Sequence, residues 1–253
     1  MRVQVLGSGP PVLLLHGSGP GTTAWGAWQS LCEALAGRFA LVAPDQAGFG
    51  GTPLPPGRPP GRALWTERAI ALMDLLGHER YAVVGHSMGG AVALSVAAER
   101  PDAVRAVVGI GCMGAPMPLP DGLDRLWAAR ATRDGAREVL GLIAADPRAP
   151  VDEAAVDARL AAMRGQPGYA DLFPPPRARW VEDLTVSGAV TAPVLLVHGA
   201  RDRIVPLREG ALPLVERLPD VRLHVLGGCG HSAHAEQPAT VHRLLAGFLE
   251  RHA

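Results

Sequence analysis

Gly85-His86-Ser87-Met88-Gly89-Gly90 is the most informative motif of this 253-residue chain. It follows a short apolar run at residues 81–84 and precedes a small-residue stretch at 91–94, which together predict a strand, a tight turn and a helix. A serine on such a turn lies at the end of a sheet, in a backbone conformation that neighbouring Cβ atoms would obstruct. The three glycines of the motif remove that obstruction, so Ser87 is a candidate nucleophile.

Short apolar runs recur along the chain in the same way. Strands that are buried on both faces of a sheet read as unbroken apolar runs, and several of the segments between them have apolar residues at helical spacing. The sequence therefore predicts an α/β fold with a doubly wound, mostly parallel sheet. The runs lie at residues 12–15, 40–43, 81–84, 104–110, 194–197 and 223–226.

One long segment lacks this alternation of apolar strands and helices. Between Gly111 and Thr191 there is no clear buried strand, and three segments with helical character are separated by breaks rich in proline and glycine. We predict that residues 113–187 form a helical cap over Ser87, inserted into a core of residues 1–112 and 188–253. Ordinary crossover helices are the alternative. The three predicted helices cover residues 121–131, 133–144 and 151–164.

The composition limits the classes of partner. Hydrophobic residues make up 48% of the chain, and 24 basic residues balance 24 acidic ones. This balance offers no basic surface to nucleic acid or to an anionic membrane, so we expect a small, largely apolar molecule as substrate. Every basic side chain is arginine, which excludes a lysine Schiff base. The sequence leaves a homodimer open.

The cysteines and the first residues indicate the cellular compartment in which the protein works. Cys32, Cys112 and Cys229 lie far apart, which argues against a disulfide framework and against a zinc site. We expect them to be small buried residues in a reducing compartment. Residues 1–5 lead almost directly into a turn without the apolar region of a signal peptide, and no apolar run approaches membrane-spanning length. These features predict a soluble, cytoplasmic protein.

A serine nucleophile needs a histidine base and a carboxylate that orients the base. In this type of fold the chain order is serine, acid, histidine, with both partners after later strands. Asp202 and His231 meet this requirement, because each follows a predicted strand. The rivals are a second histidine three residues later and three residues that we expect to have structural roles. They are His234, His16, His86 and Asp45.

The third requirement is a pair of backbone N–H groups that bind the developing oxyanion. The residue after the nucleophile, Met88, supplies one of them. Ser18, in the loop His16-Gly17-Ser18-Gly19-Pro20-Gly21, is the best position for the other. This loop lacks the spacing and the lysine of a phosphate-binding loop. We predict a serine hydrolase without a metal or a cofactor.

These motifs resemble those of the α/β-hydrolases, and in particular the meta-cleavage product hydrolases. The resemblance extends over nearly the whole chain. Within that group, Phe173-Pro174-Pro175-Pro176-Arg177-Ala178-Arg179-Trp180-Val181 is similar to the 2-hydroxymuconic semialdehyde hydrolases. The motifs that carry the wider resemblance are the loop 16–21 with Trp25, the stretch 85–90, and Cys229-Gly230-His231.

The resemblance implies hydrolysis of a C–C bond in a vinylogous diketone. The dienol substrate is converted to its keto form, a nucleophile attacks the ketone, and a dienolate leaves. Arg159 matches the arginine of the family's cap, and its fork of N–H donors suits a carboxylate or an enolate. A solvated arginine on a helix is the alternative. The other residues expected to bind substrate are Gly17, Gly19, His86 and Ser232.

Three positions depart from the family's pattern. The family usually has asparagine where this chain has His86, tryptophan where it has Ser232, and asparagine where it has Ala27. Each change removes a polar or aromatic group from the expected dienoate site. A carboxylesterase or thioesterase of the same fold is therefore the alternative function, and a non-hydrolytic protein of this fold is a third.

Overall fold

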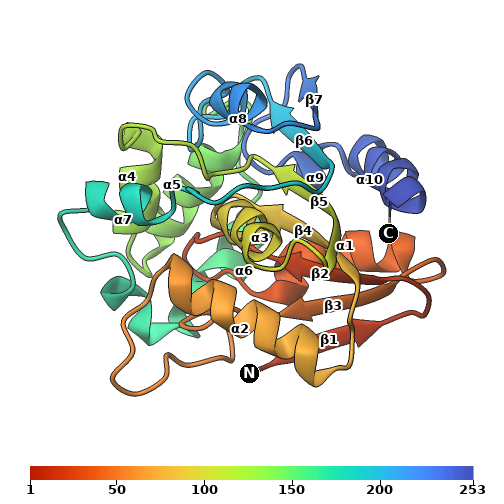
Figure 1. Cartoon of the computed structure of the whole chain (residues 1–253). Coiled ribbons are helices and arrows are strands. Elements are labelled where there is room, and N and C mark those ends of the chain that lie inside the picture. The colour runs from red at the N-terminus through yellow and green to blue at the C-terminus, as the bar shows by residue number, and fades with distance from the viewer. Residues whose placement is uncertain (253) are drawn as a thin grey trace.

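The computed structural model describes residues 1–252, and a seven-stranded sheet lies at the centre of this part of the chain (Figure 1). The strand order is β1-β3-β2-β4-β5-β6-β7, with β1 antiparallel to β3 and all other neighbours parallel. The predicted α/β class and mostly parallel sheet are confirmed. The strands are β1 (Val3–Leu6), β2 (Pro11–Leu15), β3 (Ala40–Pro44), β4 (Tyr81–His86), β5 (Val104–Ile110), β6 (Val194–Gly199) and β7 (Val221–Leu226).

Helices cover both faces of the sheet, because alternate residues of a strand point to opposite sides. Leu13 and Leu15 pack in one core with residues of α2 and α3, while Val12 and Leu14 pack in the other with α1 and α10. This double covering explains the unbroken apolar runs. The helices are α1 (Ala24–Leu35), α2 (Arg62–Leu75), α3 (Met88–Glu99), α4 (Asp121–Ala128), α5 (Arg133–Ile143), α6 (Glu153–Arg164), α7 (Ala178–Asp183), α8 (Ala211–Arg217), α9 (Ala233–Glu236) and α10 (Pro238–His252), with a 3₁₀ helix η1 at Pro167–Asp171.

The helices between β5 and β6 gather beside one end of the sheet, away from α10 (Figure 1). The three predicted helices are present as α4, α5 and α6, each shorter than expected, and η1 and α7 follow them. Apolar side chains fasten this helical group to the core that contains α2 and α3, among them Leu126, Trp127 and Phe173.

Two expectations about the strands were wrong. The first residues do not lead directly into a turn, because Val3–Leu6 pairs with β3 as an antiparallel edge strand. The run 223–226 is not buried on both faces, because β7 is the opposite edge strand and each of its residues is half-buried or exposed. Edge strands contact neighbours on one side only, so the pattern of a doubly buried strand does not apply to them.

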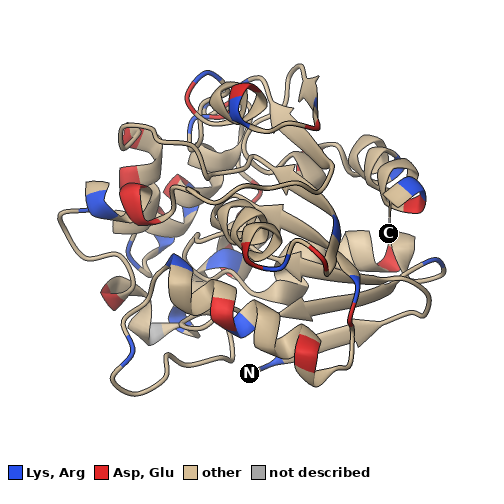
Figure 2. Cartoon of the chain, viewed as in Figure 1, with Lys and Arg blue, Asp and Glu red and all other residues tan. Residues whose placement is uncertain are grey.

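Three general features of the chain agree with the composition. Both signs of charge are interspersed over the helices and loops (Figure 2). None of the helices in residues 1–252 has the length and apolar character needed to cross a membrane. The three cysteines are free and buried, as predicted.

Candidate active site

Ser87 lies on the sharp turn between β4 and α3. Its backbone has φ 56° and ψ −120°, a strained conformation for a residue with a side chain. The turn needs glycine on both sides, since a Cβ on Gly85 would lie 2.1 Å from the carbonyl oxygen of Gly89, and one on Gly89 would lie 2.1 Å from that of Leu15. The Ser87 N–H donates to the carbonyl of Ile110 at 2.9 Å, so β5 anchors the turn. Close packing thus imposes the geometry of Ser87.

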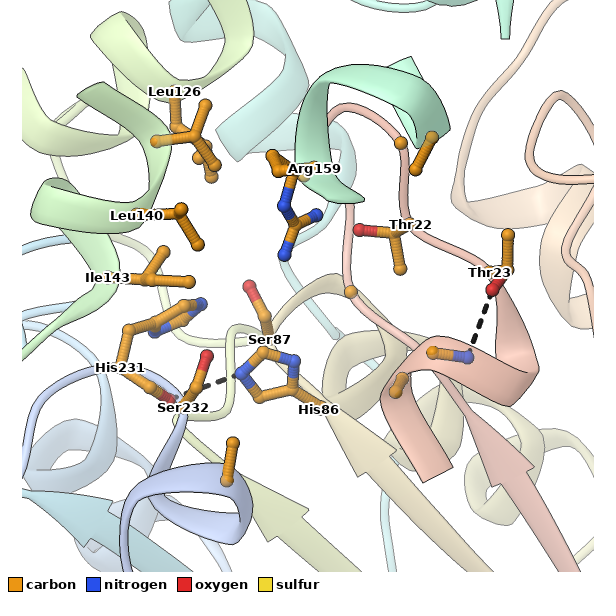
Figure 3. A pocket seen from close by; sticks show the side chains of 18 of the residues that line it. Thr22, Thr23, His86, Ser87, Leu126, Leu140, Ile143, Arg159, His231 and Ser232 are labelled. Carbon is orange, nitrogen blue, oxygen red and sulfur yellow. Dashed lines mark hydrogen bonds between the residues drawn. The ribbon is translucent and has the colours of Figure 1, made fainter. Parts of the chain in front are cut away.

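The Ser87 hydroxyl enters a cavity without a hydrogen-bond partner among the described residues. Figure 3 shows it between His231 on one side and Arg159 on the other. The side chain is 1% exposed, so little bulk water competes for this hydroxyl. Its proton is therefore available to a base that shares the cavity.

Asp202 and His231 are in direct contact, as their order and placement predict. His231 Nδ1–H donates to Asp202 Oδ2 at 2.8 Å, which leaves Nε2 as an acceptor. The second carboxylate oxygen accepts the N–H groups of Ile204 and Val205 at 2.8 and 2.9 Å. Burial acts to raise the pKa of Asp202, but His231, His198 and the N–H of Val205 outweigh it and hold that pKa below its usual value. Asp202 is therefore a fixed anion that orients His231.

The loop after β2 supplies backbone N–H groups. Neither the N–H of Ser18 nor that of Met88 donates a hydrogen bond to another described residue. His16 orients the first of them: its Nε2 accepts the N–H of Gln46 at 2.9 Å, so its Nδ1 carries the proton and donates to Gly17 O at 2.8 Å. In a trans peptide the C=O and the next N–H point in opposite directions, so this bond also fixes the direction of the Ser18 N–H. His16 has the structural role that we expected.

Side chains from the helices between β5 and β6 hold the same loop. Trp127 of α4 donates its indole N–H to Ser18 Oγ, and Tyr169 of η1 donates its hydroxyl to Ser18 O, both at 2.8 Å. Gln166 accepts the N–H of Gly21 at 3.0 Å. None of these three side chains was predicted, and no motif could have indicated them, because each is more than 100 residues from its partner.

The cavity above Ser87 has a volume of about 440 Å³. Apolar side chains of α4 and α5 form one wall, with Leu126, Leu140 and Ile143 on the side opposite Thr22 and Thr23 (Figure 3). Most of the candidate site residues line this one cavity. They are Gly17, Ser18, Gly19, His86, Ser87, Arg159, His231 and Ser232.

Arg159 is the charged side chain on the cavity wall. It extends from α6, and its Nη1 donates to Pro20 O at 3.2 Å. No carboxylate in residues 1–252 forms an ion pair with it. Burial lowers the pKa of its guanidinium, which means that the charge is poorly solvated. Arg159 is half-buried on the cavity wall and is therefore suited to bind an anion there.

The three departures from the family's pattern all lie on the cavity wall, at Ala27, His86 and Ser232. Burial, with help from His231 and His234, lowers the pKa of His86 well below its usual value, so its ring is neutral. One ring nitrogen, Nε2, lies 3.2 Å from the carbonyl oxygen of His231 and donates to it. The other, Nδ1, faces Gly17 and is left as an acceptor.

The rival residues have other surroundings. His231 precedes α9, so it does not share a helical face with His234, whose ring packs against Trp28 and His86. Burial and the neighbouring His231 lower the pKa of His234 to about 4. Asp45 does more than order its own turn, because it accepts the N–H of Ala24 at the start of α1 at 2.7 Å and that of Gly51 at 2.8 Å. No group of three or more His, Cys, Asp or Glu side chains in the described chain is arranged to hold a metal ion.

The chain is similar to known proteins over most of its length. The family described as alpha/beta hydrolase fold matches residues 10–238. The chain is 36% identical to 2-hydroxymuconate semialdehyde hydrolase of Pseudomonas sp. (strain CF600) over 251 residues, covering 96% of this chain and 88% of that protein. It is 37% identical to 2-hydroxy-6-oxo-2,4-heptadienoate hydrolase of Pseudomonas putida (strain F1) over 250 residues, covering 96% and 90%.

Solved structures give the same result. A variant of the meta-cleavage product hydrolase from Pseudomonas fluorescens IP01, complexed with acetates, superposes with a TM-score of 0.93 at 32% identity, covering 99% of this chain and 94% of that one. A 2-hydroxy-6-oxo-6-phenylhexa-2,4-dienoate hydrolase from Rhodococcus sp. strain RHA1 superposes with a TM-score of 0.83 at 34% identity, covering 97% and 93%. The similarity therefore extends along the whole chain in both sequence and structure.

Proposed function

The chain belongs to the alpha/beta hydrolase family, and we propose that this hydrolase cleaves a C–C bond in a 2-hydroxy-6-oxo-2,4-dienoate with Ser87 as nucleophile. The observation that carries the proposal is Arg159, an unpaired and poorly solvated cation that faces an apolar wall across the Ser87 hydroxyl. Such a cavity suits an elongated molecule with a carboxylate at one end and an apolar group at the other.

His231 acts as the general base and Asp202 orients it. The substrate first moves its enol proton to the carbon next to the ketone, which gives the keto form. With Nδ1–H donated to Asp202, His231 Nε2 then takes the Ser87 proton as the hydroxyl attacks the ketone carbon. The fixed negative charge of Asp202 stabilises the imidazolium that forms. The C–C bond then breaks, its electron pair passes to the dienolate oxygen, His231 returns the proton to the departing dienolate, and water hydrolyses the remaining acyl group on Ser87.

The N–H groups of Ser18 and Met88 stabilise the oxyanion that forms on the attacked carbonyl. Both belong to backbone that surrounding contacts hold in place, and neither N–H donates a hydrogen bond to another described residue. Such preorganised donors contribute on the order of 3 kcal/mol to lowering a barrier. The neighbouring glycines at 17 and 19 let the substrate approach this backbone closely.

Arg159 binds the carboxylate and the adjoining dienolate oxygen, since its planar fork of donors can serve two oxygens. His86 and Ser232 lie on the wall of the same cavity as further polar contacts. Leu126, Leu140 and Ile143 receive the apolar substituent next to the ketone. This orientation places the scissile bond at Ser87.

We further propose that residues 113–187 act as a cap on a core of residues 1–112 and 188–253. Support comes from Trp127, Tyr169, Gln166 and Arg159, which bond across from this segment to the loop after β2. Removing water from the cavity strengthens the electrostatic contacts inside it.

The surface charges and the cysteines bear on the partners and the cellular location of the protein. The balanced and interspersed charges support a small-molecule substrate and no nucleic-acid partner (Figure 2). Three free, buried cysteines support a reducing, cytoplasmic location. A homodimer is an expectation that sedimentation would test.

Ester or thioester hydrolysis is the second candidate, and the cavity wall favours it at three positions. The family pattern has asparagine, asparagine and tryptophan there, and this chain has Ala27, His86 and Ser232. An ester needs Ser87, His231 and the oxyanion donors but has no carboxylate for Arg159.

A paired steady-state assay separates the two candidates. We expect wild type to turn over 2-hydroxy-6-oxohexa-2,4-dienoates with a higher kcat/KM than short 4-nitrophenyl esters. Ser87→Ala should lower kcat/KM at least about 1,000-fold on both kinds of substrate. Arg159→Met should lower kcat/KM for the dienoates by about 100-fold, roughly 3 kcal/mol, and leave kcat/KM for the esters within about threefold of wild type. Cleavage of esters alone, abolished by Ser87→Ala, would replace the C–C hydrolase with an esterase.

A further inference from the structure

The carboxyl end of α5 lies against both loops that carry the acid and the base. A Cβ on Gly230 would lie 2.5 Å from the carbonyl oxygen of Ile143, so the loop before His231 touches the last turn of this helix. The His231 N–H donates to the same carbonyl at 2.9 Å. The Ile143 side chain also lines the cavity above Ser87. One residue of α5 thus contacts both the backbone of the base and the substrate space.

Arg203 reaches the same helix end from the other loop. It follows Asp202 directly, and its guanidinium donates to the carbonyls of Gly141, Ala144 and Ala145 at 3.0, 2.6 and 3.3 Å. The last carbonyls of a helix have no partner within the helix, and a cation there also complements the helix dipole. The last turn of α5 contains no basic residue of its own, so Arg203 supplies this charge.

Glu236 completes the attachment from α9. One carboxylate oxygen accepts the N–H of Gly230 and the other accepts the N–H of Ala145, each at 3.0 Å. The side chain therefore joins the residue before His231 to the chain just beyond α5. We call Arg203, Glu236 and the N–H of His231 the α5 clamp.

We propose that Arg203 and Glu236 are positioning residues for His231. They fasten the end of α5 to the loops of Asp202 and His231, so that the imidazole and the apolar wall at Ile143 keep a fixed spacing above Ser87. This role rests on the proposed function of His231 as base and adds a determinant of its position. A displacement of about 1 Å at a reacting group can cost about 100-fold in rate, so loosening the clamp lowers kcat.

Arg203→Met tests the clamp with two readouts that a merely structural role would not move. The first is kcat on the better substrate, corrected by fluorophosphonate titration of active Ser87. The second is the rate constant of that labelling, which needs His231 but no carboxylate-binding group. We expect both to fall by about tenfold, with KM within about twofold, and Arg203→Lys to recover part of the loss because it restores the charge with fewer donors.

Glu236→Gln is the gentler variant, because it keeps the shape of the side chain and replaces one of its two acceptors with a donor. We expect about a threefold loss in both readouts. Arg133→Met is the matched control. It removes contacts with Glu153 and Asp157 that join α5 to α6, and it does not touch either loop.

The results separate this proposal from the proposed function. Wild type whose Ser87 resists labelling would overturn both. If wild type reacts and the variants at 203 and 236 keep wild-type kcat and labelling rates, or change KM alone, the clamp has no positioning role. If Arg203→Met fails to fold, Glu236→Gln decides. Equal losses in Arg133→Met would also overturn the proposal, because they would assign the effect to general loosening of the helices.

Discussion

The turn that carries Ser87 and the loop that carries Ser18 face the same cavity, but they are held in different ways. Ser87 is fixed by glycines within three residues of it and by the strands on either side. Ser18 is fixed by hydrogen bonds from Trp127 and Tyr169, which lie more than 100 residues away. The position of Ser87 is therefore determined by a local sequence motif. The position of Ser18 is determined only when the fold brings distant segments together.

Gly89→Ala should produce the largest effect, because it breaks the local arrangement. Its Cβ would lie 2.1 Å from Leu15 O and 2.6 Å from His16 O, so backbone must move at the Ser87 turn. We expect the free energy of unfolding to drop by about 3 kcal/mol or more and activity to be lost, as measured by urea denaturation and by turnover. Gly37→Ala is the control, since a Cβ there meets no atom within 4 Å. A Gly89→Ala enzyme with wild-type stability and rate would contradict the role given to this packing.

His234 packs against His86 beside the Ser87 turn, and its titration should affect stability. The pKa of His234 is lowered to about 4 by burial and His231, whereas the unfolded chain has the ordinary value of about 6.5. The unfolded chain therefore binds more protons between these values, and the stability present above pH 6.5 is lost as the pH falls to 4. This loss amounts to as much as about 3 kcal/mol.

His234→Phe should flatten this dependence, because phenylalanine does not titrate. The comparison is of slopes, measured as the free energy of unfolding in urea between pH 7 and pH 4, so a constant packing cost of the substitution cancels. Identical slopes in the variant and wild type would show that His234 does not stay neutral in the folded protein.

Tyr169→Phe tests the long-range arrangement and should have the smallest effect. It removes a buried hydroxyl that donates to Ser18 O at 2.8 Å. We expect a loss of about 1 kcal/mol in stability and a decrease of up to about tenfold in kcat, because the loop that presents the Ser18 N–H becomes less fixed.

Tyr81→Phe is the matched control for this substitution. Its hydroxyl is also buried but has no partner among the described residues, so removing it should change stability by less than about 0.5 kcal/mol. If Tyr169→Phe behaves like Tyr81→Phe in stability and in kcat, the bond to Ser18 does not hold the loop.

The sequence predicted most of the fold because its physical causes are local. Doubly buried strands have a continuous apolar pattern, and the glycines around Ser87 mark a turn that few other residues could form. The contact between Asp202 and His231 was also predictable, since both follow parallel strands whose carboxyl ends meet at one edge of the sheet. The edge strands were predicted less well: β1 was missed, and β7 was predicted as a strand but as one buried on both faces, because each has a free side and the apolar pattern changes with it.

The support around the site could not be predicted. Trp127, Tyr169 and Gln166 occur in segments with no motif, and their partners are backbone atoms, which leave no trace in the sequence. Arg203 and Glu236 likewise bind backbone groups at the end of α5. Hydrogen bonds to the main chain fix one side chain but place no demand on the residue type at the other end.

The lone guanidinium of Arg159 also affects how the enzyme responds to its solvent. A half-buried, poorly solvated cation without a counter-ion attracts small anions that fit the cavity, and an anion that binds only the folded chain raises its melting temperature by mass action. If Arg159 binds the carboxylate of the substrate as proposed, we expect acetate, phosphate and chloride in a buffer to compete with it. Apparent affinities for such substrates will depend on the identity and concentration of the buffer salt, while those for neutral esters will not.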